Sequence, residues 1–274
     1  MANYLTYPCK VMRITQSYTG TTSHLPHTTG SPKSYPWDEG CSNGGREGFY
    51  CPCDEVVIKR IYGIGTSGTN TIWIESTSKV DFADNTKDYA CGKIIHSNDS
   101  DIRDLKVGQK FKRGQLICYE GTDGATGNHL HLSFGKGKFT GKGWVKNSKG
   151  KYCLTCTKGA YKPEELFYID PKFTKVVNSK GLKFKELPPK YTKGTYVINT
   201  TELRVRKGAS TSNDIIPYSK FTAKAKEQIK KIKGSKYKES YFVKGMKIDI
   251  TKIKNNWGKC KTGWICLDYC KKKK

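Results

Sequence analysis

Hydrophobic positions in this chain fall in short runs separated by turn-forming residues. In the first part these runs are residues 56–58 with Ile61, 71–74, 115–118 and 129–132. Segments rich in Gly, Asn and Asp, such as 63–70 and 121–128, separate them, and this alternation predicts short strands joined by turns. Similar runs continue toward the C-terminus at residues 196–198, 203–206, 241–243, 247–253 and 263–267. The pattern therefore predicts a mainly β protein.

Helical signals are few and short. They cover residues 101–105 and 163–167, where Pro163 opens a turn with two glutamates. The lysine-rich segment 220–236 predicts either a long loop or an irregular helix. Two adjacent prolines in residues 183–193 favour an extended linker. We therefore expect two domains, over residues 1–172 and 195–274, with a linker over residues 173–194.

Charge divides the chain in a similar way. The 274 residues include 50 Lys and Arg against 24 Asp and Glu, a net charge of +26. Residues 172–274 hold 28 basic and 7 acidic residues, whereas residues 1–171 hold 22 and 17. A second part this basic suits a polyanion, such as nucleic acid, an acidic glycan, an anionic lipid or teichoic acid.

Two targeting features are missing from the sequence. There is no run of 18 apolar residues, which excludes a transmembrane helix. Residues 1–5 lack a basic stretch followed by an apolar core, so we expect no export signal. Eleven cysteines, an odd number, then favour reduced thiols that serve mostly as small core residues. Cys153 and Cys156 have the spacing of a zinc-binding pair, but no second pair follows to complete a four-thiolate site.

Candidate chemistry is concentrated on histidine. All five histidines lie in the first part of the chain: His24, His27, His96, His129 and His131. His129 and His131 flank one residue of a predicted strand, so both imidazoles project from the same face. Such a pair can place a metal ligand beside a group that acts on water or substrate, although two surface histidines produce the same spacing.

Ordered motifs surround this histidine pair. Residues 127–132 are GNHLHL, residues 14–18 are ITQSY followed by Ser23 and His24, and residues 35–38 are YPWD. Between them lie YCPCDEVV at 50–57, IIH at 94–96, LKVGQ at 105–109, KRGQ at 112–115 and GTDG at 121–124. Over residues 11–135 this succession resembles the lysostaphin-type peptidoglycan metallopeptidases, zinc endopeptidases that cut peptide bonds of the bacterial cell wall.

The resemblance implies an antiparallel β-sheet metallopeptidase domain holding one Zn²⁺. Its ligands would be His24, Asp38 and His131, a set with an open fourth position that suits catalytic zinc. His96 and His129 would be the catalytic pair that orients and deprotonates the attacking water. The 14 positions from His24 to Asp38 exceed the usual gap of the family, and His27, 11 positions away, is an alternative ligand. We favour His24 because its distance from residues 16–18 matches the family better.

Motifs in the second part carry another resemblance. Residues 203–208 (LRVRKG), 245–246 (GM), 257–259 (WGK) and 263–269 (GWICLDY) resemble a bacterial SH3-like wall-binding domain, over about residues 195–274. This implies a small β-barrel. For at least one of Trp257 and Trp264, core packing is favoured over ligand contact.

Together the two resemblances predict a phage endolysin. Its partners would be peptidoglycan and anionic wall polymers, without nucleic acid or membrane insertion. With no export signal, we expect it in the host cytoplasm before lysis and at the wall after membrane permeabilisation. The alternatives are a secreted autolysin, a non-enzymatic wall binder with a degenerate peptidase domain, and a basic nucleic-acid-binding protein. The sequence leaves three candidates for the bond that is cut: a glycine cross-bridge, a D-Ala-linked cross-link or a bond of the stem peptide.

Overall fold

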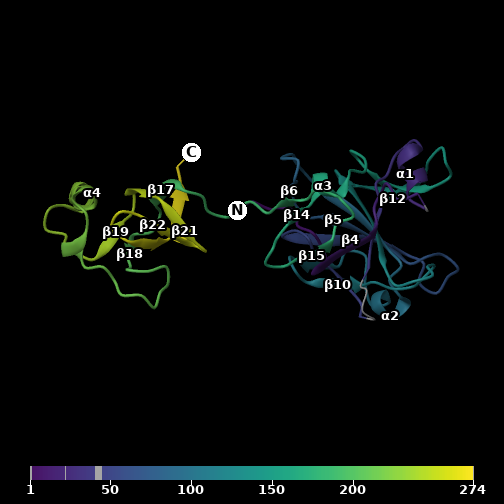
Figure 1. Ribbon diagram of the computed structural model, residues 1–274, viewed down its shortest axis with the longest axis horizontal. Helices are drawn as coiled ribbons and strands as arrows, with labels where there is room; N and C mark the ends of the chain where they lie inside the picture. The colour runs from purple at the N-terminus through teal and green to yellow at the C-terminus, as the bar shows by residue number, and fades with distance from the viewer. Residues whose placement is uncertain (1, 22, 41–44, 274) are drawn as a thin grey trace. The chain divides into compact units, whose positions relative to one another are not determined.

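The computed structural model describes residues 2–21, 23–40 and 45–273. The chain divides into two compact units, Met1–Leu187 and Pro188–Lys274 (Figure 1). Each unit has its own hydrophobic core. Strands make up most of the regular structure of both units, which confirms the expected mainly β fold class.

An eight-stranded sheet forms the centre of the first unit. Its spatial order is β15-β1-β2-β11-β8-β5-β4-β9. Neighbouring strands are antiparallel, except that β15 runs parallel to β1. Their bounds are β1 Val11–Gln16, β2 Trp37–Glu39, β4 Glu55–Tyr62, β5 Thr71–Ser76, β8 Ala90–Ile95, β9 Lys110–Lys112, β11 Leu130–Lys136 and β15 Lys175–Asn178.

Short paired strands and helices complete the first unit. The pairs are β3 Gly48–Tyr50 with β10 Leu116–Tyr119, β6 Val80–Asp81 with β7 Lys87–Asp88, β12 Phe139–Lys146 with β13 Tyr152–Cys156, and β14 Tyr168–Ile169 with β16 Lys185–Glu186. The helices are α1 Leu25–Thr29, α2 Asp99–Ile102 and α3 Pro163–Leu166.

The central sheet has one core face and one face that carries polar chemistry. Side chains alternate along a strand, and the core face presents fully buried aliphatic and aromatic groups: Ile72, Ile74, Ile94, Leu130, Leu132 and Phe134. The intervening positions point to the other face and include Thr71, Trp73, Lys93, Ile95, His131 and Ser133. Because the hydrophobic residues pack into the core, the side chains that alternate with them project from the opposite face, where they can form a functional site.

The segment expected to be a linker is partly folded. Val176 of β15 pairs with Met12 of β1, and β16 pairs with β14, so residues up to Leu187 belong to the first unit. Thr174 donates a hydrogen bond to the Cys9 carbonyl at 2.8 Å. All four residues of β15 are exposed, so this edge strand lacks the hydrophobic alternation that reveals a strand in the sequence. The units divide at the first of the two prolines.

The second unit is built from short antiparallel pairings. β17 Gly194–Ile198 lies between β20 Lys247–Ile250 and β24 Cys270–Lys272, and β18 Glu202–Arg204 pairs with β19 Tyr241–Val243. β22 Trp257–Lys259 lies between β21 Lys252–Lys254 and β23 Trp264–Cys266. Of the two tryptophans singled out above, Trp257 is buried and Trp264 is half-buried.

The lysine-rich segment of this unit forms a helix, α4 Ala223–Lys233, rather than a loop. Thr222 caps it by accepting a hydrogen bond from the Ala225 backbone, the stabilising arrangement at a helix start. Ala225 and Ile229 pack into the core of the unit, whereas most of the lysines stay exposed. Two 3₁₀ turns, Tyr218–Lys220 and Leu267–Tyr269, accompany the strands.

No helix among the described residues is long and apolar enough to cross a membrane. The ten described cysteines are all free thiols and eight of them are buried, in agreement with the expectation of small core residues. Cys41 lies outside the described residues.

Candidate active site

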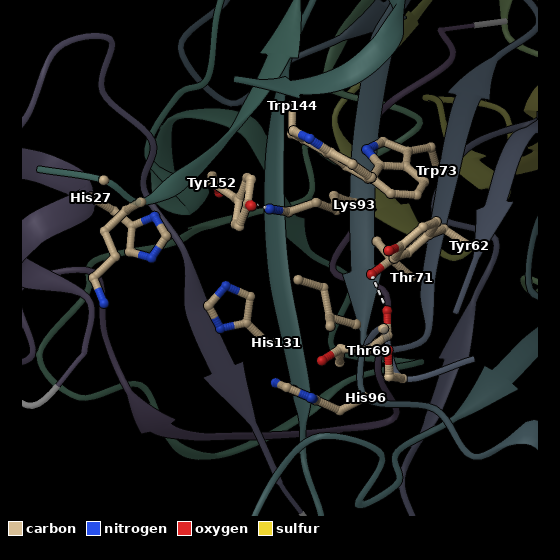
Figure 2. A pocket seen from close by; sticks show the side chains of 15 residues that line it. His27, Tyr62, Thr69, Thr71, Trp73, Lys93, His96, His131, Trp144 and Tyr152 are labelled. Carbon is tan, nitrogen blue, oxygen red and sulfur yellow. Dashed lines mark hydrogen bonds between the residues drawn. The ribbon is translucent and has the colours of Figure 1, made fainter. Parts of the chain in front are cut away.

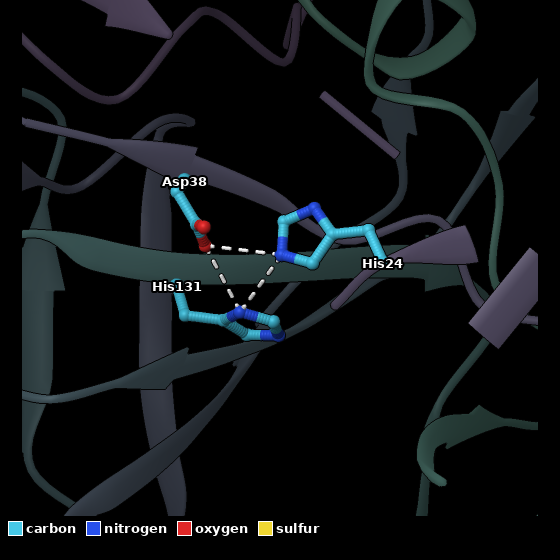
Figure 3. A group of neighbouring side chains, drawn as sticks. All are labelled: His24, Asp38 and His131. Atoms are coloured by element: carbon cyan, nitrogen blue, oxygen red, sulfur yellow. Dashed lines mark hydrogen bonds and ion pairs between the residues drawn. The ribbon is translucent and has the colours of Figure 1, made fainter. Parts of the chain in front are cut away.

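Three side chains that are distant in the sequence converge on one point: His24, Asp38 and His131 (Figure 3). His131 Nδ1 lies 3.0 Å from Asp38 Oδ1, and His24 Nε2 lies 3.2 Å from the same oxygen. The two histidine nitrogens are 3.3 Å apart. Within the described part of the chain, these three side chains place potential ligand atoms close enough together to share one metal ion.

Strand register positions two of the three. Asp38 in the centre of β2 stands directly opposite His131 of β11 in the antiparallel ladder. His24 precedes α1 and is completely buried. Its Nδ1–H donates to the Ser17 carbonyl at 3.0 Å, which leaves the lone pair on Nε2, the atom that faces Asp38 and His131. A hydrogen bond from the second ring nitrogen is the usual way to orient a metal-binding histidine.

The spacing of the three atoms fits zinc. Zinc binds nitrogen and oxygen at about 2.0–2.1 Å in tetrahedral geometry, which places ligand atoms about 3.3 Å from one another. The three observed separations, 3.0, 3.2 and 3.3 Å, are close to this tetrahedral edge. Two nitrogens and one carboxylate oxygen leave a fourth position for water or substrate.

Protonation also favours a metal. Burial alone would raise the pKa of Asp38, but hydrogen bonds and charge interactions with His131 and His24 outweigh it and hold that pKa well below its usual range. Burial lowers the pKa of His131 to about 3. At neutral pH the group therefore presents an ionised carboxylate and a neutral imidazole, the forms that bind metal ions.

A second histidine pair lies beside this cluster. The rings of His96 and His129 have centroids 4.5 Å apart, and His129 Nε2 lies 3.9 Å from Asp38 Oδ1. His96 Nδ1–H donates to the Asp123 carbonyl at 2.7 Å, and His129 Nδ1–H donates to the Gly127 carbonyl at 2.8 Å. In both residues the lone pair is therefore on Nε2, ready to accept a proton.

The backbone at His96 is in the left-handed region, with a φ of 80°. Its N–H donates to the Asn70 carbonyl at 3.1 Å, and its carbonyl accepts from the Asp123 N–H at 3.3 Å. Non-glycine residues adopt this conformation rarely and at a cost, and such positions cluster at functional sites. The surrounding hydrogen bonds keep His96 at the end of β8 with its ring beside His129.

His27, the alternative ligand, does not join the cluster. It lies in α1 with its ring centroid 6.1 Å from that of His131, and its Nδ1 lies 3.8 Å from Cys153 Sγ. Burial lowers its pKa to about 4. Of the two histidines left open by the sequence, the structure thus brings His24 to Asp38 and places His27 at the edge of the neighbouring cleft.

The cleft has a volume of about 600 Å³ and includes His27, His96 and His131 in its lining (Figure 2). Its other side is aromatic, formed by Tyr62, Trp73, Trp144 and Tyr152. The rings of Trp73 and Trp144 have centroids 4.9 Å apart, and the Arg60 guanidinium lies 4.6 Å from the Trp144 centroid. A cleft lined by aromatic side chains together with a few polar groups is typical of a ligand site.

Sequence reasoning missed this aromatic wall and the lysine beneath it. Lys93 and Trp73 are opposite each other in the β8–β5 ladder, and both face the cleft. Trp73 lies within a predicted strand, but choosing its face requires the register with β8. Trp144 and Tyr152 come from the β12–β13 pair, which the hydrophobic pattern did not reveal.

The chain matches no protein-family model and no curated protein. Among solved structures, a zinc-containing peptidase from Vibrio cholerae aligns with a TM-score of 0.30 and 22% identity. That alignment covers 49% of this chain but only 36% of the other. Lysostaphin in solution aligns with a TM-score of 0.31 and 14% identity over 85% of this chain and 80% of that one. The antimicrobial peptidase lysostaphin from Staphylococcus simulans aligns with a TM-score of 0.30 and 15% identity, over 84% of this chain and 78% of that one. At TM-scores near 0.3, the side-chain geometry of this chain remains the basis for a functional proposal.

Proposed function

We propose that this protein is a zinc-dependent endopeptidase that hydrolyses peptide bonds of bacterial peptidoglycan. The observation that carries the proposal is the cluster of His24, Asp38 and His131 at the spacing of zinc ligands, with His96 and His129 beside it. The ordered motifs over residues 11–135 support peptidoglycan as the substrate.

Each group has a distinct role in the proposed reaction. Zinc held by His24, Asp38 and His131 would supply a Lewis acid that polarises the scissile carbonyl and acidifies water. His129 and His96, with acceptor Nε2 atoms fixed by their Nδ1–H hydrogen bonds, take up the proton of the attacking water and return one to the leaving amine. The cleft would hold the peptide with its scissile bond beside these groups.

The second unit would bind the wall. Residues 188–274 hold 23 basic and 6 acidic residues, a net charge of +17, and the motifs over about residues 195–274 resemble an SH3-like wall-binding domain. Binding to peptidoglycan and to anionic wall polymers would raise the effective concentration of the enzyme at its insoluble substrate. We extend the proposal to a phage endolysin that accumulates in the host cytoplasm and reaches the wall after membrane permeabilisation.

A digestion of purified peptidoglycan tests the proposal. Mass spectrometry of the released fragments should show new peptide amino termini, none in the presence of a chelator, and recovery after zinc is added back. Their sequences would identify which of the three candidate bonds is cut. Absence of new termini at full zinc occupancy would overturn the proposal. Co-sedimentation with purified walls and binding to purified DNA, measured in parallel, separates wall binding from nucleic-acid binding.

A further inference from the structure

Lys93 is a cationic side chain at the bottom of the cleft. It lies in β8, two residues before Ile95, and therefore projects from the same face of the sheet. Ile95 stands opposite His131, and Lys93 stands opposite Trp73 on one side and Ser133 on the other. The Lys93 row is thus about 7 Å along the strands from the row that contains His131.

The charge of Lys93 has no counterion among the described residues. The residue is only 4% exposed. Its Nζ donates to the Tyr152 carbonyl at 3.1 Å (Figure 2), and no carboxylate in the described part of the chain forms an ion pair with it. An ammonium has three donors, so two remain for other partners. Burying a charge without a counterion is costly. An anion that binds beside Lys93 would therefore offset part of this desolvation cost.

The surroundings of Lys93 favour an anion over a cation. No Asp or Glu is among the described residues that line the cleft, whereas Lys151 is. Trp73, which stands opposite Lys93, is completely buried, and a charge-assisted hydrogen bond is stronger in such low-dielectric surroundings than in water. A carboxylate entering beside Lys93 would form such a bond.

We infer that Lys93 binds a carboxylate of the substrate and makes this enzyme selective for an anionic peptide. The inference rests on the proposed function and specifies its substrate. An extended peptide advances about 3.3–3.6 Å per residue, so a site about 7 Å from the ligand row corresponds to a carboxylate within about two residues of the scissile bond. Lys93 acts as a specificity residue and takes no part in proton transfer.

The test compares two pools of soluble cross-linked muropeptides, released from peptidoglycan by a muramidase. One pool is native, and in the other, carbodiimide and ammonia have converted carboxylates to carboxamides. Wild-type full-length protein should cleave the native pool with a kcat/KM about 10- to 100-fold higher, the range for one hydrogen bond to a charged group. Lys93→Met should lose this preference by slowing on the native pool alone, with zinc content and melting temperature retained. Lys93→Gln, which still can donate to the Tyr152 carbonyl, should behave in the same way.

Lys149→Met is the matched control, because Lys149 is exposed and outside the cleft lining. It removes the same charge and should keep the wild-type ratio. Equal wild-type rates on the two pools, or a wild-type ratio in both Lys93 variants, would overturn the inference. If neither pool is cleaved at full zinc occupancy, the proposed function fails instead. Calorimetric binding of the same pools to wild type and Lys93→Met then decides the role of Lys93.

Discussion

Single alanine substitutions of three histidines should separate metal binding from proton transfer. His131 contributes one of three ligand atoms in the cluster, His129 lies beside the cluster, and His27 lines the cleft without joining it. The three residues are close in space: the ring centroids of His27 and His131 are 6.1 Å apart, and His131 and His129 have ring nitrogens 3.0 and 3.9 Å from the same Asp38 oxygen. A non-specific disturbance of the cleft would therefore affect all three variants alike, whereas the proposed roles require three different results.

The magnitudes follow from the ligand geometry. Zinc bound by four protein ligands has apparent binding free energies of about 10–16 kcal/mol, or about 2.5–4 kcal/mol per ligand. His131→Ala should therefore weaken zinc binding by about 10²–10³-fold. His129→Ala keeps all three ligands, so it should retain zinc and lose about 10²–10⁴-fold in rate, the usual contribution of a positioned acid or base. His27→Ala should change neither quantity by more than about threefold, well below the effects expected of a ligand or a base.

The assay pairs two measurements on each variant. Competition with a fluorescent zinc chelator gives the affinity, and hydrolysis of soluble muropeptides at saturating zinc gives kcat/KM. Equal zinc loss in His129→Ala and His131→Ala would refute the division of roles. Loss of zinc in His27→Ala, with full affinity in His24→Ala, would show that the wrong histidine of the α1 region had been assigned as a ligand.

Four further outcomes are expected. A chain ending at Leu187 should keep the fold of the first unit and its zinc but co-sediment poorly with walls. A chain ending at residue 175 loses Leu182 and Phe184, which are partly buried and pack against the core, and should melt about 6–12 °C lower in differential scanning calorimetry, from about 3 kcal/mol of lost burial. Asp84→Ala should destabilise the protein by about 2 kcal/mol in urea titrations, because it removes the carboxylate from the buried Lys136 ammonium. Asp214→Ala, which breaks an exposed pair with Lys207, should leave the midpoint unchanged. Chelation should lower the melting temperature, since zinc at about 1,000 times its Kd stabilises the native state by about 4 kcal/mol; an unchanged melting curve would mean that no metal was bound.

Strands that carry a hydrophobic run between turn residues could be predicted closely from the sequence. The runs at residues 56–61 and 71–74 correspond to β4 and to the wholly buried β5, because aliphatic and β-branched residues between turns mark a strand that packs on a core. β15 could not be found in this way, since its residues are exposed and its pairing with β1 spans the whole first unit. The first domain, expected to end at residue 172, consequently leaves out β15 and β16, whereas the division between the units falls inside the expected linker.

The metal cluster could be proposed from motifs, but the choice between His24 and His27 required coordinates. Both residues lie within four positions of each other, and either could reach Asp38 in an extended loop. The hydrogen bond from His24 to the Ser17 carbonyl and the start of α1 at Leu25 turn His24 inward and His27 toward Cys153. Lys93 had no signal in the sequence, because an isolated lysine in a strand is ordinarily a solvated residue.

The left-handed backbone of His96 implies a conflict between folding stability and catalysis at one residue. A side chain at a φ of 80° costs about 1–2 kcal/mol that glycine would not. Glycine at this position would relieve the strain but remove the imidazole beside His129. The folded protein is therefore less stable than its topology allows, and selection for thermal resistance alone would favour replacement of His96. A laboratory screen that rewarded only resistance to heat would lead toward a protein of the same fold without its proposed chemistry, whereas a screen for lysis would keep the strained histidine.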